Sequence, residues 1–331
     1  MLDPWAKSAK APPKIAFLFL TKGKILHTDV WERYLADAES ASVYVHSMPT
    51  ALDHTFPDLP PVFRRALIPS VQTEYLKNLM HGMVQLLLYA HADARNAQFV
   101  FVSENSLPVK PFEHVYRELV NDTTSRFCIS PGGQARTAWG GLLKHSPHPE
   151  RVPNSTAWLK AELWSSLSRA HVDHLVANHD QVLHLARDYA LHVGTRGLAA
   201  ADELVLPTVL HQRFGNAGFN TCHGGMDQSA SVATGCCITY TFWPDYSEQH
   251  PQRAFAPLFG DKSRCDGGCC PCKYRKLPEG AVRDLIRAPG FFFVRKIDAA
   301  SVIIPESNPK ATVPVAAGWL PLLEASGATP R

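Results

Sequence analysis

No stretch of this sequence reaches the ~20 consecutive apolar residues that cross a membrane as a helix. The longest early apolar run, Ile15–Leu20, is the size of one strand. The opening residues also lack the apolar core of a secretory signal. We therefore expect a soluble chain as written, with a membrane anchor only if one precedes it.

The sequence also has no large excess of positive or negative charge. Charged residues make up 19% of the chain, the net charge is +3, and no long run of Lys and Arg occurs. A nucleic-acid partner usually requires a basic tract, so none is expected here. Apolar residues make up 45% of the 331 residues, which is typical of a globular protein with a large core.

Several enzyme motifs are missing. The sequence contains no G-x-G-x-x-G, G-x-x-x-x-G-K-[ST], G-x-S-x-G or H-E-x-x-H. It also has no Asp-x-Asp, the pair with which many nucleotide-sugar transferases hold a divalent metal. The nearest pattern, Asp37-Ala38-Glu39, belongs to a predicted helix and is interpreted as a solvated face. No metal site is expected.

The eight cysteines are unevenly placed. Cys128 stands alone, and the others are Cys222, Cys236, Cys237, Cys265, Cys269, Cys270 and Cys272. The spacing lacks two separate C-x-x-C pairs, so it favours disulfides or free thiols over zinc. A zinc site made by the clustered thiols with His223 nearby remains an alternative.

The N-terminal half has the pattern of a β-α-β unit. Apolar runs at 14–23 and 41–47 flank an amphipathic helix at 27–39, which predicts a parallel sheet. A long helix over 73–94 leads to a third buried strand, 97–104. In open α/β sheets, ligands bind beyond the carboxyl ends of the strands, and this strand ends at Ser103-Glu104.

The second half is less regular. We expect helices over 112–120, in the second half of 155–176, over 180–193 and over 278–288, with strands over 126–133, 235–243 and 291–298. No composition shift divides the chain. The prediction is one domain over 14–304, with an N-terminal extension (1–13), an inserted loop (247–278) and a loosely structured, proline-containing tail (305–331).

The stretch "AADELVLPTVL" sets two acids before Pro207. Proline is best tolerated at the first position of a helix, where its missing N–H would be unpaired anyway. The helix is therefore predicted to begin near Pro207, which leaves Asp202–Leu206 in a loop. Such acids are commonly solvated, so this pattern alone does not identify a working carboxylate.

Eight segments occur in a fixed order: "FLFLTKG", "YVHS", "FVSENSLP", "STAWLKAELW", "ADELVLPTVL", "TYTFWPD", "HPQRAF" and "FFFVRK". Together they resemble the core-2/I-branching β-1,6-N-acetylglucosaminyltransferase superfamily, especially its plant and algal branch, over roughly residues 14–300. The resemblance implies a GT-A-like α/β fold with a mixed, mostly parallel central sheet flanked by helices. It also implies a type II membrane protein of the Golgi lumen.

The implied reaction is inverting, metal-independent transfer of a sugar from a UDP-sugar to a glycan or glycoprotein acceptor. Glu203 matches the family's catalytic base, while Asp202 is expected to brace the loop or cap the helix start. On the donor side the matching residues are Lys296, Arg295, Arg253 or His250, His46 and Thr21. Fixed cations are the consistent substitute for a metal at the leaving diphosphate.

The residues that match the acceptor side are Ser103, Glu104, Trp158, Lys160, Trp164 and Trp243. A small Gly-Ser pair of the family is replaced here by Ala161-Glu162, so the acceptor cannot be carried over. N-acetylglucosamine as the donor sugar rests on the resemblance, and xylose, glucuronic acid and other sugars stay open.

Two other functions remain as alternatives. One is a non-catalytic carbohydrate- or protein-binding module with a zinc-binding cysteine cluster. The other is a nucleotide-sugar hydrolase, in which water replaces the acceptor. Independently of these functions, the single residues have structural alternatives: Arg295 and Lys296 could only end a surface strand, and Trp158 and Trp164 could belong to the core.

Overall fold

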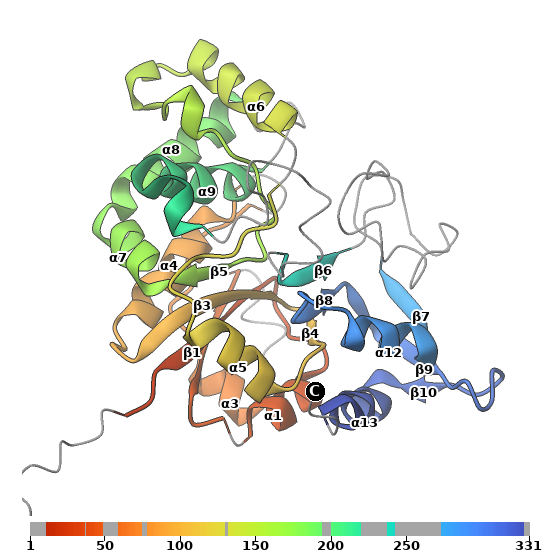
Figure 1. The fold of residues 1–331 in the computed structure, drawn as a ribbon. Helices are drawn as coiled ribbons and strands as arrows, with labels where there is room; N and C mark the ends of the chain where they lie inside the picture. The colour runs from red at the N-terminus through yellow and green to blue at the C-terminus, as the bar shows by residue number, and fades with distance from the viewer. Residues whose placement is uncertain are drawn as a thin grey trace, which may run out of the picture.

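The computed structural model describes residues 11–36, 38–48, 59–74, 78–129, 132–193, 200–219, 237–241 and 273–327. A four-stranded sheet of order β2-β1-β3-β5 lies at its centre (Figure 1). Its strands are β1 (Lys14–Thr21), β2 (Ala41–Ser47), β3 (Asn96–Ser103) and β5 (Ser166–Ser168). Because β1 runs parallel to both β2 and β3, and only β5 is antiparallel, the expected mixed, mostly parallel sheet is confirmed.

Helices and two smaller sheets surround the central sheet (Figure 1). The helices are α1 (Thr28–Leu35), α3 (Pro61–Arg65), α4 (Met80–His91), α5 (Phe112–Val120), α6 (Gly132–His145), α7 (Arg169–Ala177), α8 (His179–His192), α9 (Ala201–Phe214), α12 (Glu279–Arg287) and α13 (Val315–Gly327). Short 3₁₀ turns occupy Pro149–Arg151, Ser155–Ala157 and Gly215–Gly218.

The smaller sheets bring together strands that are far apart in the sequence. One has the order β4-β8-β6, from Leu107–Pro108, Phe293–Arg295 and Thr239–Thr241. The other has the order β10-β9-β7, from Val313–Pro314, Ile297–Ile304 and Tyr274–Pro278. The strand β8 is thereby placed beside β4, which follows the end of β3.

Alternate residues of β1 face two separate cores, as the two-residue period of a strand requires. Phe17 and Phe19 belong to one core and meet Trp31 of α1 with ring centroids 6.0 and 5.1 Å apart. Leu18 and Leu20 belong to the other core, which includes the buried face of α4. Helices on both faces therefore exclude water from β1, and its carboxyl end is held in a fixed place.

Two predicted elements differ from the structure. Within the predicted strand 126–133, the described residues 126–129 form no strand, because Arg126 and Ile129 make only isolated bridges, and α6 already begins at Gly132. Their apolar pattern reflects the burial of Phe127 and Cys128. The helix predicted from residue 73 begins only at Met80, whose N–H donates to the Asn78 side chain.

The C-terminal tail was expected to be loosely structured, and this is wrong for its last described part. There α13 packs against α1, α12 and β9. Trp319 is fully buried, and its indole N–H donates to the carbonyl of Pro108 at 2.7 Å. The predicted loop 247–278 also ends in a strand, β7, which pairs with β9. Proline content suggested a loose segment, whereas the apolar residues between the prolines decided the packing.

Candidate active site

A cavity of about 380 Å³ lies where β1 and β3 end. We call it the strand-end cavity. Predicted site residues that line it are Thr21, Ser103, Glu104, Trp164, Arg295 and Lys296. The position agrees with the expectation that ligands bind beyond the carboxyl ends of parallel strands. Cavities of this size accommodate small-molecule ligands.

The turn that follows β3 organises this cavity. The Ser103 hydroxyl donates to Asn105 Oδ1 at 2.9 Å and lies 2.7 Å from the Ser106 hydroxyl. The Glu104 carbonyl accepts the N–H of Leu26, and the Asn105 carbonyl accepts the N–H of Ile297. One turn thus fixes both the loop after β1 and the start of β9.

Most of the charged side chains that line the cavity are basic. Arg295 and Lys296 are 8% and 7% exposed. A second cavity of about 240 Å³ shares Lys22, Lys273, Lys296, Glu104 and Asn105 with the strand-end cavity. Across both, the charged lining residues are Lys22, Lys24, Lys273, Arg295, Lys296, Glu104 and Asp298. Basic groups outnumber acidic ones, so the two cavities attract an anion.

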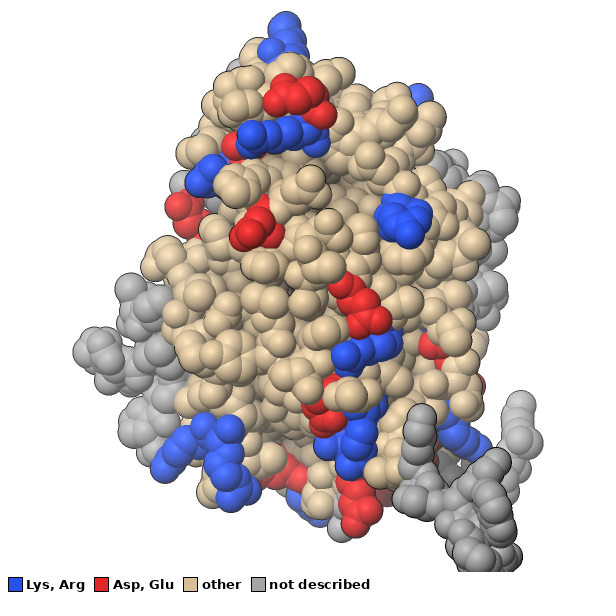
Figure 2. Space-filling view, turned by 90° about the vertical axis from the view of Figure 1, so that its left-hand side faces the viewer, with Lys and Arg blue, Asp and Glu red and all other residues tan. Residues whose placement is uncertain are grey.

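On the face shown in Figure 2, by contrast, basic and acidic side chains are interspersed and separated by wide uncharged areas.

The helix that carries Glu203 begins earlier than predicted. Helix α9 starts at Ala201, so Asp202 and Glu203 lie in its first turn and Pro207 lies inside it. A proline in this position cannot donate to the carbonyl four residues earlier, which is that of Glu203. That carbonyl instead accepts the N–H of Ala161 at 2.8 Å. The predicted helix start at Pro207 is wrong because a long-range donor replaces the missing one.

The carboxylate of Glu203 forms an ion pair with Lys160. Its Oε2 lies 3.1 Å from Lys160 Nζ, and the two side chains are 25% and 13% exposed. Lys160 was expected on the acceptor side and Glu203 at the reaction centre, and the two side chains are in contact. Glu203 does not line the strand-end cavity in the described part of the chain.

Asp202 is buried, and its side chain hydrogen-bonds to the residue before α4 instead of to its own loop. Its Oδ1 accepts the N–H of Leu79, the residue before α4, at 3.2 Å. Leu79 also lines the strand-end cavity. Burial, together with the charge of neighbouring Glu203, raises the pKa of Asp202 to about 6.

The two tryptophans lie in different surroundings. Trp164 is buried and lines the strand-end cavity, where the guanidinium of Arg295 lies 4.3 Å from its ring centroid. Trp158 packs against the core beside α9 and donates its indole N–H to the carbonyl of Pro153 at 2.7 Å. Trp164 therefore belongs to the cavity, and Trp158 does not contribute to its lining.

His46 is likewise outside the cavity lining. Its ring is fully buried, Nε2 lies 3.1 Å from the backbone of Val71, and the ring packs against Gly82 of α4. Burial lowers the pKa of His46, so the ring is neutral near pH 7. Thr21, in contrast, reaches the cavity while its hydroxyl donates to the His46 carbonyl.

Three predicted site residues, His250, Arg253 and Trp243, lie outside the described residues, as does the cysteine cluster at 265–272. Among the described residues, no group of His, Cys, Asp and Glu could hold a metal ion. Lys22, Lys24 and Lys273 were not predicted. The first two follow directly after β1 and could have been found from that position, whereas Lys273 reaches the cavity only through the pairing of β7 with β9.

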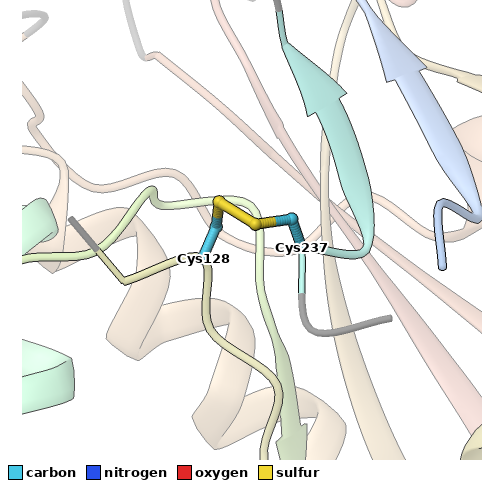
Figure 3. The surroundings of a disulfide bond; sticks show 2 residues. All are labelled: Cys128 and Cys237. Carbon is cyan, nitrogen blue, oxygen red and sulfur yellow. A yellow bond between two sulfur atoms is a disulfide. The ribbon is translucent and has the colours of Figure 1, made fainter. Parts of the chain in front are cut away.

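One disulfide joins two segments that lead to residues of the strand-end cavity. Cys128 and Cys237 are bonded across 109 residues, and Cys237 precedes β6 (Figure 3). The Cys128 carbonyl accepts the N–H of Glu162, and β6 pairs with β8. The expectation of disulfides is confirmed for this pair, which links the Trp164 segment to the strand of Arg295.

Comparison with known proteins identifies the family of the chain. Residues 15–285 match the family model described as Core-2/I-Branching enzyme, so the chain belongs to that family. It is also 27% identical over 188 residues to a protein of Oryza sativa subsp. japonica described as glycosyltransferase BC10. That match covers 54% of this chain and 44% of the rice protein. Within the described residues, no helix has the length and apolar character needed to span a membrane.

Proposed function

We propose that this protein is an inverting, metal-independent glycosyltransferase that moves a sugar from a UDP-sugar to a glycan or glycoprotein acceptor. Membership of the Core-2/I-branching family and the likeness to a rice glycosyltransferase support the reaction class. A GT-A arrangement, the Golgi lumen and N-acetylglucosamine as the transferred sugar come from the family resemblance and belong to this proposal.

The observation that carries the proposal is the basic strand-end cavity. A sugar leaves its nucleotide as the diphosphate takes the bonding electron pair, so negative charge develops on the leaving oxygen. Arg295 and Lys296 are buried beside one another at that cavity, where their charges are poorly screened. They would neutralise the leaving diphosphate in the place that Asp-x-Asp enzymes give to a metal.

Glu203 would be the general base. The acceptor hydroxyl gives its proton to the carboxylate, its oxygen bonds to the anomeric carbon, and the bond from that carbon to the diphosphate breaks on the opposite face. Lys160, 3.1 Å from Glu203, would hold the carboxylate in one orientation until the acceptor arrives. Trp164 would offer an apolar ring to a sugar.

The test is a panel of UDP-sugars, first screened by thermal stabilisation and then assayed for transfer, with Glu203→Gln as the variant. A ligand that binds only the folded state raises the apparent melting temperature. The variant should keep the stabilisation and lose transfer by at least ~100-fold. The matched control is Glu150→Gln, an exposed carboxylate of a 3₁₀ turn, which should transfer at the wild-type rate.

Full transfer by Glu203→Gln would overturn the assignment of the base. UDP release that does not depend on acceptor would favour a hydrolase. About one bound zinc per chain without any UDP binding would favour the non-catalytic module.

A further inference from the structure

The segment 159–164, which we call the docked segment, lies against α9 through contacts to two residues of that helix, Glu203 and Thr208. The Ala161 N–H donates to the Glu203 carbonyl at 2.8 Å. The Thr208 hydroxyl accepts the N–H of Leu159 at 2.9 Å and donates to the Leu159 carbonyl at 3.0 Å. Lys160 completes the set with its ion pair to the Glu203 carboxylate.

Pro207 makes the first of these contacts available. In an uninterrupted helix, the N–H of residue 207 would donate to the Glu203 carbonyl, and the Ala161 N–H would have to compete for it. Proline has no N–H, so the carbonyl is left for the docked segment. Proline in a helix interior is otherwise unfavourable. Here its cost is offset by a contact that only a missing donor allows.

Thr208 makes the second contact, and its hydroxyl group makes every hydrogen bond of which it is capable. A hydroxyl can donate once and accept twice. Thr208 donates to the Leu159 carbonyl and accepts from the N–H of Leu159 and from the indole N–H of Trp139, 3.1 Å away. The residue is completely buried, so water cannot substitute for these partners.

The docked segment carries functional groups at both ends. Lys160 touches the carboxylate of Glu203, and Trp164 lines the strand-end cavity and stacks with Arg295. Anything that fixes residues 159–161 on α9 therefore fixes the distance between the proposed base and the proposed diphosphate site.

We propose that Pro207 and Thr208 are positioning residues: they clamp the docked segment to α9 so that Glu203 and the strand-end cavity keep the spacing that transfer requires. This inference rests on the proposed function for its kinetic consequence. Its structural half, the dependence of the Ala161 contact on Pro207, stands without that function.

The main test is Pro207→Ala. Alanine restores an N–H at position 207, which then competes for the Glu203 carbonyl, while its high helix propensity keeps α9 folded. We expect amide hydrogen exchange at Ala161 to become at least ~10-fold faster, because its acceptor is taken. We expect kcat to fall by about 10- to 100-fold with the KM for the UDP-sugar within about twofold, since misplacement of a reacting group has effects of this size.

The chain offers a matched control. Pro321 also lies inside a helix, α13, but the carbonyl four residues before it belongs to exposed Ala317. Pro321→Ala should change neither Ala161 exchange nor kcat. A merely structural role of Pro207 predicts that the two variants behave alike.

Thr208 is tested by a pair of variants. Thr208→Val keeps the shape and removes the hydroxyl, and should lower kcat by at least ~10-fold. Thr208→Ser keeps the hydroxyl and should restore kcat to within about threefold of wild type. Wild-type kcat in Thr208→Val together with a loss in Thr208→Ser would show that the methyl group, and hence packing, is what matters, and would overturn the clamp at this residue.

The two proposals fail in different ways. A wild-type protein that transfers no sugar would overturn the proposed function, and Ala161 exchange would still decide the clamp. Unchanged Ala161 exchange in Pro207→Ala would overturn the clamp even in an active enzyme. Faster exchange with unchanged kcat would overturn its role in positioning.

Discussion

The guanidinium carbon of Arg295 lies 4.3 Å from the centroid of the Trp164 ring. Both side chains are nearly buried, and they come from segments 131 residues apart in the sequence. Cation–aromatic contacts are strongest when water is excluded. Trp164 was predicted to belong to the acceptor side and Arg295 to the donor side, so this contact joins the two sides.

Replacing Trp164 should therefore weaken donor binding as well as acceptor binding. Trp164→Ala removes the ring that holds Arg295, and the Kd for UDP measured by calorimetry should rise by about 10-fold. Trp164→Phe retains an aromatic face, so its Kd for UDP should rise less than that of Trp164→Ala. If Trp164→Ala binds UDP as tightly as wild type, Arg295 is positioned by other contacts.

Transfer should not depend on a divalent metal. Because buried Arg295 and Lys296 would supply the positive charge at the diphosphate, activity in EDTA should remain within about twofold of the untreated enzyme. The same assay with added Mg²⁺ or Mn²⁺ serves as the control. Complete loss in EDTA that Mn²⁺ restores would contradict the metal-independent mechanism.

The Cys128–Cys237 disulfide should contribute strongly to stability. It closes a loop with a sequence separation of 109, and loops of that length correspond to about 3–5 kcal/mol of free energy of unfolding in the chain-entropy description. The free energy of unfolding of the double variant Cys128→Ala/Cys237→Ala, measured in urea, should be lower than that of wild type by this amount. Wild type in the presence of a reductant should show the same decrease. A loss below about 1 kcal/mol would mean that the unfolded state is already constrained.

Asp202 should make stability depend on pH. Burial and the charge of Glu203 raise its pKa from 3.8 to about 6. Below about pH 4 the carboxyl is protonated in both folded and unfolded states, and it contributes no slope. Between about pH 4 and 6 the folded state keeps a proton that the unfolded state releases, so the free energy of unfolding falls as the pH rises.

Asp202→Asn removes this titration while keeping an oxygen that can accept the Leu79 N–H. Relative to wild type, the free energy of unfolding of the variant should increase by about 2–3 kcal/mol between pH 4 and pH 7. Chemical unfolding of both proteins in the same buffers measures the difference. A constant difference across this range would show that Asp202 titrates in its ordinary range.

The local pattern was sufficient for the N-terminal β-α-β unit. Every residue of β1 from Ile15 to Leu20 is apolar, which requires burial on both faces, and the helix at 28–35 has its apolar residues on one side. Such features depend on neighbours within a few residues, so the sequence carries them directly. The strand-end residues Ser103 and Glu104 followed from the same logic, since parallel strands end at one edge, whereas Thr21 was named from the family resemblance.

The same local reasoning failed where a distant partner changed the outcome. Pro207 was expected to begin a helix because its missing N–H is harmless there. Inside α9 it is equally acceptable, because Ala161, 42 residues before Glu203 in the sequence, supplies the donor that proline lacks. No rule confined to neighbouring residues contains that hydrogen bond.

By itself, then, the sequence determined the N-terminal β-α-β unit, the third parallel strand and the residue types at the ends of these strands. Only the tertiary structure decided that Lys160 pairs with Glu203, that Arg295 stacks on Trp164, and that Lys273 joins the same basic cavity. Periodicity and turn preference are short-range properties of the chain. Ion pairs, stacking and cavity walls instead depend on which distant segments the folded chain brings within a few ångströms of each other.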